Sequence, residues 1–287
     1  MSAAVPDAVA QGGAAAPGPQ LMAGKRGLIF GVANDHSIAW GIARALAQQG
    51  AELAFTYQDE ALRRRVQPLA ESVGGRVVTE CDVERPETVA ATFDAVKSAW
   101  GRLDFVVHAV AFSDKAELRG RYVDTSRANF LRTLRISCYS FTELARRAEP
   151  LMADGGSLVT LTYLGATRVM PSYNVMGVAK AALEASVRYL AVDLGKQKIR
   201  VNAISAGPMR TLAGSAIGDA RYVWRYNRDH SPLRRNVTLE EVGGAALYLL
   251  SDLSAGVTGE IVHVDGGFHV LGIPKPENGQ PNGDNGG

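Results

Sequence analysis

The chain has 287 residues, of which 46% are hydrophobic and 21% are charged, and its formal net charge is +2. This balance is ordinary for a globular protein with a sizeable core, and the length suits one large α/β domain or two small ones. The basic residues are scattered, which argues against nucleic acid or an acidic membrane as the main partner. The two cysteines, Cys81 and Cys138, offer neither a disulfide framework nor the spacing of a metal site. We therefore expect a reducing, cytoplasmic location and no metal.

The two ends of the sequence differ in composition from its middle. Residues 1–23 are rich in Ala, Pro and Gly and fit neither a signal peptide nor a transit peptide, and residues 274–287 are rich in Pro, Gly and Asn. No apolar run approaches the ~20 residues that span a bilayer. We predict a disordered tail over 1–23, one folded domain over 24–273 and a second disordered tail over 274–287.

Short β-branched runs alternate with longer stretches of helical apolar spacing. The first half is predicted as strand and helix in turn: 26–32, 37–50, 52–57, a charged helix, 76–83, 87–100 and 103–112. The second half begins with a long helix and continues the alternation: 125–152, 157–165, 173–194, 199–207, 239–251 and 260–267. The strands are apolar on both faces, as in a parallel sheet covered by helices. The sequence predicts a single doubly wound, Rossmann-like α/β domain with a seven-stranded parallel sheet.

The loop after the first predicted strand is where a dinucleotide pyrophosphate should lie, because a helix N-terminus there offers free N–H groups and a positive dipole end. The usual GxGxxG pattern is absent. The loop instead reads Gly31, five residues, Ser37, one residue and Ala39. Ser37 also suits the simpler role of a helix N-cap. The position after the first strand favours cofactor binding.

The end of the second predicted strand should face the adenosine ribose. Gln58 stands there, followed by the acidic Asp59 and Glu60. A 2′-phosphate would require a positive group, so the sequence favours NAD(H) over NADP(H), although Arg63 and Arg64 could reach back.

The third predicted strand ends at an acidic residue. Asp82, followed by Val83, is placed to accept a hydrogen bond from the adenine amino group. The alternative for Asp82 is a turn former at the strand end.

Tyr173 and Lys180 lie seven positions apart at the start of a predicted helix. Seven residues turn about 700°, which keeps both on one helix face but separates them by about 10 Å along the axis. The two can act together only if Tyr173 reaches back along the helix or leaves its first turn. A lysine favours the ionised form of a nearby phenol, and a phenol can donate to a substrate carbonyl on which charge develops. Tyr163 ends the preceding strand and should face the same crevice, whereas Thr160 is either a site hydroxyl or a plain core threonine.

These features resemble those of the NADH-dependent bacterial enoyl-acyl-carrier-protein reductases of the short-chain dehydrogenase/reductase superfamily. The resemblance covers nearly everything from Gly24 to Phe268. It is carried by the Gly31, Ser37 and Ala39 loop, by the arrangement of Tyr163, Tyr173 and Lys180, and by five further stretches: 50–58, 81–83, 162–191, 199–213 and 251–268.

The resemblance implies hydride transfer from NADH to the β-carbon of a trans-2-enoyl thioester carried on acyl carrier protein. Tyr173 would hydrogen-bond the thioester carbonyl and stabilise the enolate, Lys180 would hold the nicotinamide ribose, and Tyr163 would support substrate orientation or protonation. Substrate contacts are implied for Ser113, Tyr163 and Tyr173. Cofactor contacts are implied for Gly31, Ser37, Ile38, Gln58, Asp82, Val83, Val110, Lys180, Met209, Arg210, Thr211, Leu212 and Ala213.

The resemblance also implies a mobile substrate lid over residues 211–227, and a homotetramer with the helices around 125–150 and 173–194 at its interfaces. One departure concerns Ala109 and Ala111, where many members of the family have Ser and Gly. The added methyl group of Ala111 would narrow the acyl channel without removing a catalytic group.

Two other functions remain open at this point. One is a short-chain reductase that acts on a C=O group, such as a 3-ketoacyl or carbonyl reductase. The seven-residue spacing of Tyr173 and Lys180 counts against it, because that chemistry normally uses a spacing of four. The other is a non-catalytic dinucleotide-binding sensor, which the set formed by Tyr163, Tyr173 and Lys180 makes less favoured.

Overall fold

Within residues 20–215 and 218–274, which are those that the computed structural model describes, seven strands form one sheet in the order β3-β2-β1-β4-β5-β6-β7. Every neighbouring pair is parallel, so the predicted doubly wound sheet is confirmed. The strands are β1 (Arg26–Phe30), β2 (Glu52–Tyr57), β3 (Val77–Glu80), β4 (Phe105–His108), β5 (Gly156–Thr162), β6 (Ile199–Ala206) and β7 (Ile261–Val264).

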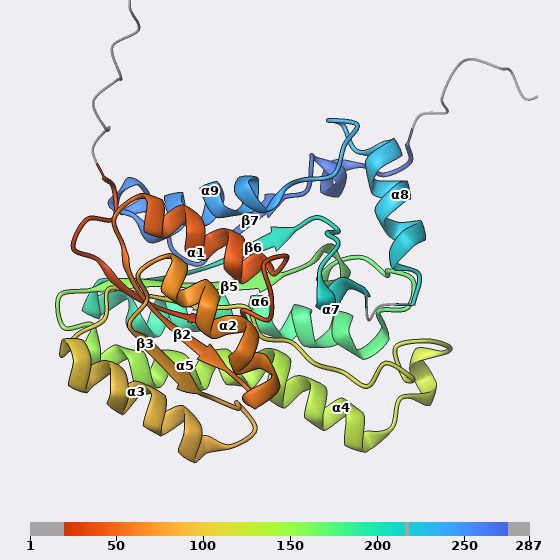
Figure 1. Cartoon of the computed structure of the whole chain (residues 1–287). Helices are drawn as coiled ribbons and strands as arrows, with labels where there is room; N and C mark the ends of the chain where they lie inside the picture. Colours follow the sequence, from red (N-terminus) through yellow and green to blue (C-terminus); the bar gives the residue numbers. More distant parts are fainter. Residues whose placement is uncertain (1–19, 216–217, 275–287) are drawn as a thin grey trace, which may run out of the picture.

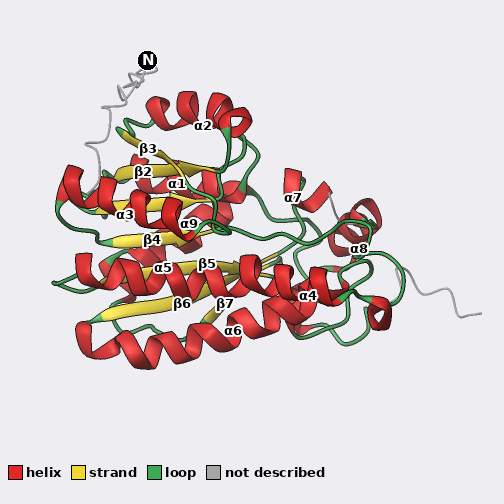
Figure 2. Ribbon diagram, turned by 90° about the horizontal axis from the view of Figure 1, so that it is seen from below, coloured by secondary structure: helices red, strands yellow, loops and turns green. Residues whose placement is uncertain are grey.

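The helices form two layers around this sheet (Figures 1 and 2). The helices α1 (Ile38–Gln48), α2 (Glu60–Ser72) and α9 (Leu239–Leu250) pack on one face, and α3 (Pro86–Trp100), α5 (Ser140–Ala148) and α6 (Asn174–Leu194) pack on the other. Each face buries its own apolar cluster, because the strands present Leu, Ile, Val and Phe on both sides.

The strand order reverses between β1 and β4, so the loops that follow these two strands diverge in opposite directions and leave a crevice at the carboxyl edge of the sheet. Gly31, the first residue after β1, has a φ of 97°. A Cβ at this position would lie 2.1 Å from the backbone oxygen of Ala109, which follows β4. Both the left-handed backbone and the close approach therefore require glycine at the floor of the crevice.

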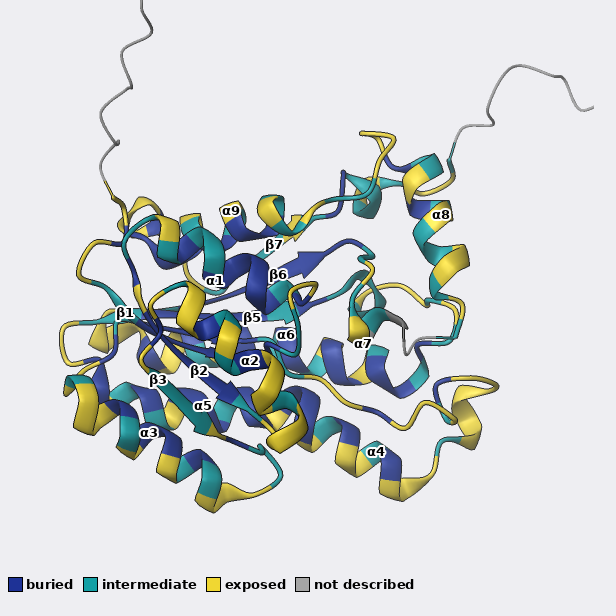
Figure 3. Cartoon of the chain, viewed as in Figure 1, coloured by how far each residue is buried: buried dark blue, intermediate teal, exposed yellow. Residues whose placement is uncertain are grey.

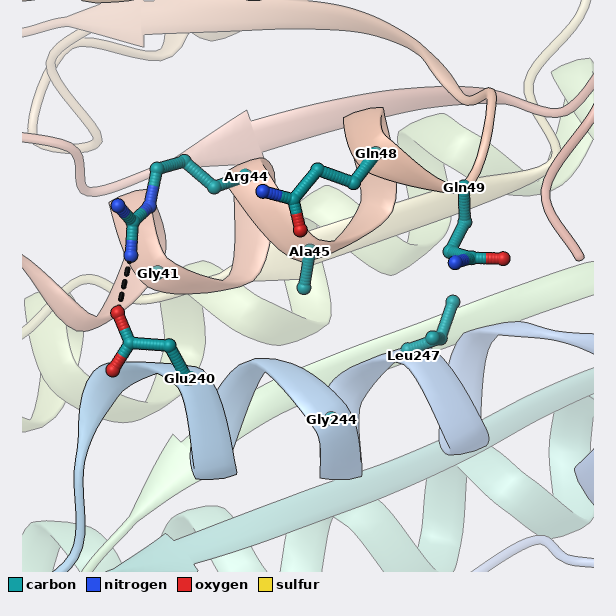
Figure 4. A pocket seen from close by; sticks show the side chains of 8 residues that line it. All are labelled: Gly41, Arg44, Ala45, Gln48, Gln49, Glu240, Gly244 and Leu247. Carbon is teal, nitrogen blue, oxygen red and sulfur yellow. Dashed lines mark hydrogen bonds and ion pairs between the residues drawn. The ribbon is translucent and has the colours of Figure 1, made fainter. Parts of the chain in front are cut away.

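Helices α1 and α9 lie in close contact because glycines face the crossing. A Cβ on Gly41 would lie 2.8 Å from the Cβ of Leu239, and one on Gly243 would lie 2.9 Å from the backbone oxygen of Gly41. A groove between the two helices is crossed by an ion pair of Arg44 with Glu240 (Figure 4). This groove belongs to the layer of α1 and α9. Lys180 lies in α6, in the opposite layer, and Tyr173 directly precedes α6.

The long helix predicted over 125–152 is interrupted. The structure has α4 (Arg127–Leu134), a π-helical turn (Arg135–Tyr139), α5 and a 3₁₀ turn (Glu149–Leu151). The sequence pattern did not reveal the π turn, because Ile136 and Cys138 remain buried as they would be in an α-helix. The wider turn directs the Ser137 hydroxyl at Phe112 in the loop after β4, where it donates to the Phe112 carbonyl and accepts from the Phe112 N–H, both at 3.0 Å.

Several predicted strands are shorter than expected. β3, β4 and β7 each stop before the end of the predicted ranges 76–83, 103–112 and 260–267. Their last residues leave the sheet at its carboxyl edge and form the loops that surround the crevice. β-branched composition alone does not distinguish these loop residues from the strand.

The packed chain begins before the predicted boundary at Gly24. Met22 is fully buried, and its N–H donates to the Gln49 carbonyl at 2.9 Å, which ties it to the end of α1. The predicted tail residues 1–19 and 275–287 lie outside the described part of the chain. Two helices, α7 (Leu212–Ser215) and α8 (Ala220–His230), stand beyond the carboxyl ends of the strands, and Asn227 is the one buried residue of α8 (Figure 3). Among the helices that the structure describes, none is long and apolar enough to cross a membrane.

Candidate active site

Tyr173 lies outside the regular helix that carries Lys180. α6 begins at Asn174, and the residues on either side of Tyr173 both have left-handed backbone, with φ of 52° at Ser172 and 35° at Asn174. This turn takes the tyrosine off the helical path. Of the two arrangements that the seven-residue spacing permits, the structure has the one in which Tyr173 leaves the first turn.

Tyr163 and Tyr173 face each other at the carboxyl end of β5. Their ring centroids are 5.1 Å apart and the rings meet edge to face at 70°. Gly165 leaves the room for this pair, since a Cβ there would lie 2.4 Å from the Tyr173 ring. Burial raises the pKa of both phenols above the ordinary value. Both are therefore protonated at neutral pH and available as hydrogen-bond donors.

Lys180 is buried in the first half of α6, and its ammonium donates to the Leu161 carbonyl of β5 at 2.8 Å. Burial lowers the pKa of Lys180 from its ordinary value to about 8, against the opposing effect of Cys138 and Glu184. The side chain therefore carries a positive charge at neutral pH, and a modest rise in pH removes it.

Glu184 is a residue of this region that the sequence reasoning missed. It lies one helical turn after Lys180, and its carboxylate accepts a 2.7 Å hydrogen bond from the Thr162 hydroxyl. Burial raises the pKa of Glu184, while Thr162, Arg188 and Lys180 act in the opposite direction. The i, i+4 spacing from Lys180 was the available signal, because it places both side chains on one helix face.

Thr160 is a core residue and does not supply a hydroxyl to the tyrosine pair. It is fully buried, and its Oγ1 lies 2.7 Å from Nδ1 of the equally buried His108 on β4. The other ring nitrogen, Nε2, lies 2.8 Å from Oγ of Ser140, which itself donates to the Ile136 carbonyl. Ser140 must therefore accept from Nε2–H, and Thr160 donates to Nδ1. Burial lowers the pKa of His108 to about 3, so this histidine is neutral.

The loop between β1 and α1 is shaped by Ser37. Its hydroxyl accepts hydrogen bonds from the N–H groups of Ala33 and Asn34, both at 3.0 Å, rather than capping the helix that starts at Ile38. The loop begins at Gly31, and α1 starts directly after Ser37. The close approach of the loops after β1 and β4 and the positive end of α1 suit a pyrophosphate, so the residues present fit a dinucleotide.

The end of β2, which is predicted to face the adenosine ribose, is followed by the predicted acidic residues. Gln58 is exposed at the end of β2, and Asp59 caps α2 by accepting from the Leu62 N–H at 2.8 Å. Glu60 forms ion pairs with two arginines of the same helix. Its Oε2 lies 3.4 Å from Nη1 of Arg63, and its Oε1 lies 3.9 Å from Nε of Arg64. These ion pairs turn both guanidinium groups toward a carboxylate of their own helix.

Asp82 forms a turn at the end of β3. Its Oδ1 accepts from the Glu84 N–H at 2.9 Å, which is the turn-forming role that the sequence left open. Val83 lies beside it and is half-buried. Contact of these two residues with adenine stays a prediction.

The loop after β4 carries the residues predicted for the nicotinamide and the substrate. Val110 packs against the core, and Ala111 is exposed. Ser113 is buried, and its hydroxyl is within hydrogen-bond distance of Thr133 (2.9 Å) and Asn129 (3.2 Å) of α4. This network holds the loop against α4, and the contact of Ser113 with substrate stays a prediction.

The segment after β6 joins the site to α7 and α8. Met209 packs against the core, and the Arg210 guanidinium lies 4.2 Å from the ring centroid of Trp224 in α8. Thr211 accepts from the Gly214 N–H at 2.9 Å, which fixes the first turn of α7. Leu212 opens that helix and is about half exposed, whereas the side chain of Ala213 and residues 216–217 of the predicted lid lie outside what the structure describes.

A family model described as enoyl-(acyl carrier protein) reductase matches residues 31–269. The chain belongs to this family. A curated relative from Rhizobium meliloti (strain 1021), named enoyl-[acyl-carrier-protein] reductase [NADH] 1, is 64% identical over 253 residues, covering 88% of this chain and 93% of the relative.

Two solved structures of the family superpose closely on this chain. The enzyme of Anaplasma phagocytophilum, in complex with NAD, has a TM-score of 0.87 and 64% identity, and the match covers 89% of this chain and 98% of that one. The Bacillus cereus enzyme, solved with NADP+ and an indole naphthyridinone, has a TM-score of 0.86 and 51% identity, covering 88% and 99%. Among residues 20–215 and 218–274 no group of three or more His, Cys, Asp or Glu side chains is arranged to hold a metal.

Proposed function

We propose that the protein reduces the C=C bond of trans-2-enoyl thioesters on acyl carrier protein with NADH, the last step of the fatty-acid elongation cycle. The observation that carries this proposal is the pair of protonated phenols, the partly buried Tyr163 and the buried Tyr173, which meet in the layer that also holds the buried Lys180. When bound, NADH supplies the hydride that is added to the β-carbon of the substrate.

The chain's own residues handle the charge that this addition creates. Tyr173 donates a hydrogen bond to the thioester carbonyl oxygen, where the negative charge of the enolate develops. Its raised pKa keeps the proton on the phenol until that charge appears. Tyr163, held edge-on against Tyr173, orients the thioester, and the Lys180 ammonium donates to the hydroxyls of the nicotinamide ribose.

The choice of NADH rests on the adenosine side. Gln58 offers no positive charge to a 2′-phosphate, and Glu60 holds Arg63 and Arg64 in ion pairs on α2. The Bacillus cereus structure was solved with NADP+, and the ratio of kcat/KM for NADH to that for NADPH measures the specificity of this protein.

Loss of absorbance at 340 nm tests the function. The purified protein should oxidise NADH in the presence of a crotonyl thioester, and it should use NADPH less efficiently. Activity on an acetoacetyl thioester alone would replace the proposal with a C=O reductase. Cofactor binding without activity on either thioester would favour a dinucleotide sensor.

The pH dependence of kcat/KM for NADH should report Lys180. We expect kcat/KM to fall with a slope of one above about pH 8, because the free enzyme loses the lysine cation there while both tyrosines stay protonated. The Tyr173→Phe variant should have a lower kcat/KM at every pH, and its kcat/KM should show the same alkaline decline. A decline that disappears in Tyr173→Phe would assign the titration to the phenol instead.

We further propose a homotetramer in the cytoplasm. Large apolar side chains are exposed on α6, namely Val178, Tyr189 and Val192, and further exposed apolar side chains, Leu131 and Tyr139, lie in α4 and the π turn. These are the helices expected at the interfaces, and such exposed apolar residues favour subunit contact. Cys81 and Cys138 are both free and buried, which suits a reducing compartment. Light scattering in solution measures the assembly, and a monomeric mass would contradict it.

A further inference from the structure

Glu84, in the loop after β3, is held by two arginines from α4 and the π turn. Its carboxylate accepts from Nε of Arg132 at 3.1 and 3.0 Å and from Nη2 of Arg132 at 2.6 Å, and it also accepts from Arg135. The Glu84 side chain is 16% exposed, whereas the two arginine side chains are 50% and 54% exposed. The hydrogen bonds from Arg132 lower the pKa of Glu84, so the carboxylate is charged at neutral pH.

Glu84 is tied directly to the predicted adenine contact. Its N–H donates to the Asp82 carboxylate at 2.9 Å, so the two acidic residues and Val83 between them form one tight turn. The backbone of Glu84 is therefore tied to the residues that would meet the adenine ring.

Arg132 extends the connection to the other end of the crevice. Its guanidinium lies 4.4 Å from the ring centroid of Phe112, in the loop after β4. Ser137 holds the backbone of Phe112 through two hydrogen bonds. The residues just before Phe112 are Val110 and Ala111, which border the predicted nicotinamide site.

We propose that Glu84 is a positioning residue for the cofactor, which fixes the distance between the adenine loop and the nicotinamide loop by holding Arg132 and Arg135. The inference rests on the dinucleotide binding of the proposed function. A cofactor that spans both loops binds more tightly when they are already in place, because less ordering is required on binding. Two arginines on one carboxylate impose a fixed geometry. Exposed ion pairs add little to folding stability, so the effect falls mainly on cofactor affinity.

The test compares Glu84→Gln with Glu80→Gln. Glu80 is the last residue of β3 and pairs with Arg85 at 2.6 Å, whereas Arg132 and Arg135 form their ion pairs in the described part of the chain with Glu84. Arg85 also lies 3.6 Å from the Asp82 carboxylate and keeps that partner in Glu80→Gln. Both variants therefore lose one negative charge in the same region. Long-range electrostatics alone would make either variant bind the anionic NADH more tightly. A loss of affinity in Glu84→Gln only is therefore a sign of lost positioning.

We expect the NADH dissociation constant, measured by fluorescence titration, to rise about fivefold in Glu84→Gln and to stay within about twofold in Glu80→Gln. KM for NADH should rise in parallel while kcat at saturating NADH is kept. Arg132→Met should give a similar rise, and the double variant Glu84→Gln/Arg132→Met should add little to it. Thermal unfolding curves verify that each variant is folded.

Unchanged affinity in Glu84→Gln, equal effects of the two glutamate variants, or a fall in kcat at constant KM would each overturn the inference. Titration of the wild type without substrate separates this result from the proposed function. A wild type that binds NADH without reducing a thioester contradicts the function alone, and a wild type that binds no NADH contradicts both.

Discussion

Replacing Tyr173 with phenylalanine should lower kcat/KM for a crotonyl thioester by about 100-fold, while the NADH dissociation constant stays within about twofold. The ring is buried against Tyr163 and would remain in place, so the variant removes only the hydroxyl that we propose donates to the substrate carbonyl. Initial rates at saturating NADH and fluorescence titration of NADH measure the two quantities separately.

Tyr163→Phe is the matched control for this variant. It removes the hydroxyl of the partner ring in the same edge-to-face pair. We expect a fall in kcat/KM of about tenfold or less, because the role proposed for Tyr163 is to orient the substrate rather than to stabilise the enolate. A larger loss in Tyr163→Phe than in Tyr173→Phe would reverse the two roles.

Lys180→Met should weaken NADH binding by about 10- to 100-fold, the range for a lost hydrogen bond from a charged donor. The same variant should be more stable than the wild type at pH 7. Burial lowers the pKa of Lys180 from 10.5 to about 8. At pH 7 the amine is protonated in both states, and keeping this cation buried in the folded state lowers the free energy of unfolding. The gain should stay below about 3 kcal/mol. In the variant the Leu161 carbonyl loses the hydrogen bond that Lys180 donates at 2.8 Å, and this loss offsets part of the gain in stability.

The pH dependence of this gain provides the control. Between pH 8 and 10.5 the unfolded wild-type chain binds the lysine proton and the folded one does not, so wild-type stability rises with pH. The advantage of Lys180→Met in urea unfolding should therefore shrink as pH rises from 8 toward 10. A variant that is less stable than wild type at pH 7, or a gain that grows with pH, would contradict the buried-cation explanation.

The sequence by itself determined the order of the seven strands, the helices that cover the two faces of the sheet, and the parallel pairing of the strands. Alternation of short apolar runs with helical spacing is a local property, and right-handed crossovers restrict how such units assemble. The sequence also predicts that Gly31, Tyr163 and Tyr173 lie at the carboxyl edge of the sheet. Each follows a predicted strand, and the loops after parallel strands converge at that edge. The resemblance to the enoyl reductases, confirmed by the family match, indicated the reaction and the cofactor.

Only the tertiary structure decided what several of these residues do. Tyr173 leaves the helix through left-handed backbone at its two neighbours, Thr160 bonds to a buried histidine, and Ser113 turns toward α4. The physical reason is common to all three. Periodicity tells which face of an element is buried, whereas the direction of a hydroxyl or a strained backbone angle depends on partners from segments distant in the sequence. The link from Glu84 to Arg132 and Phe112 is of this kind, since it joins three separate segments through side chains that share no pattern.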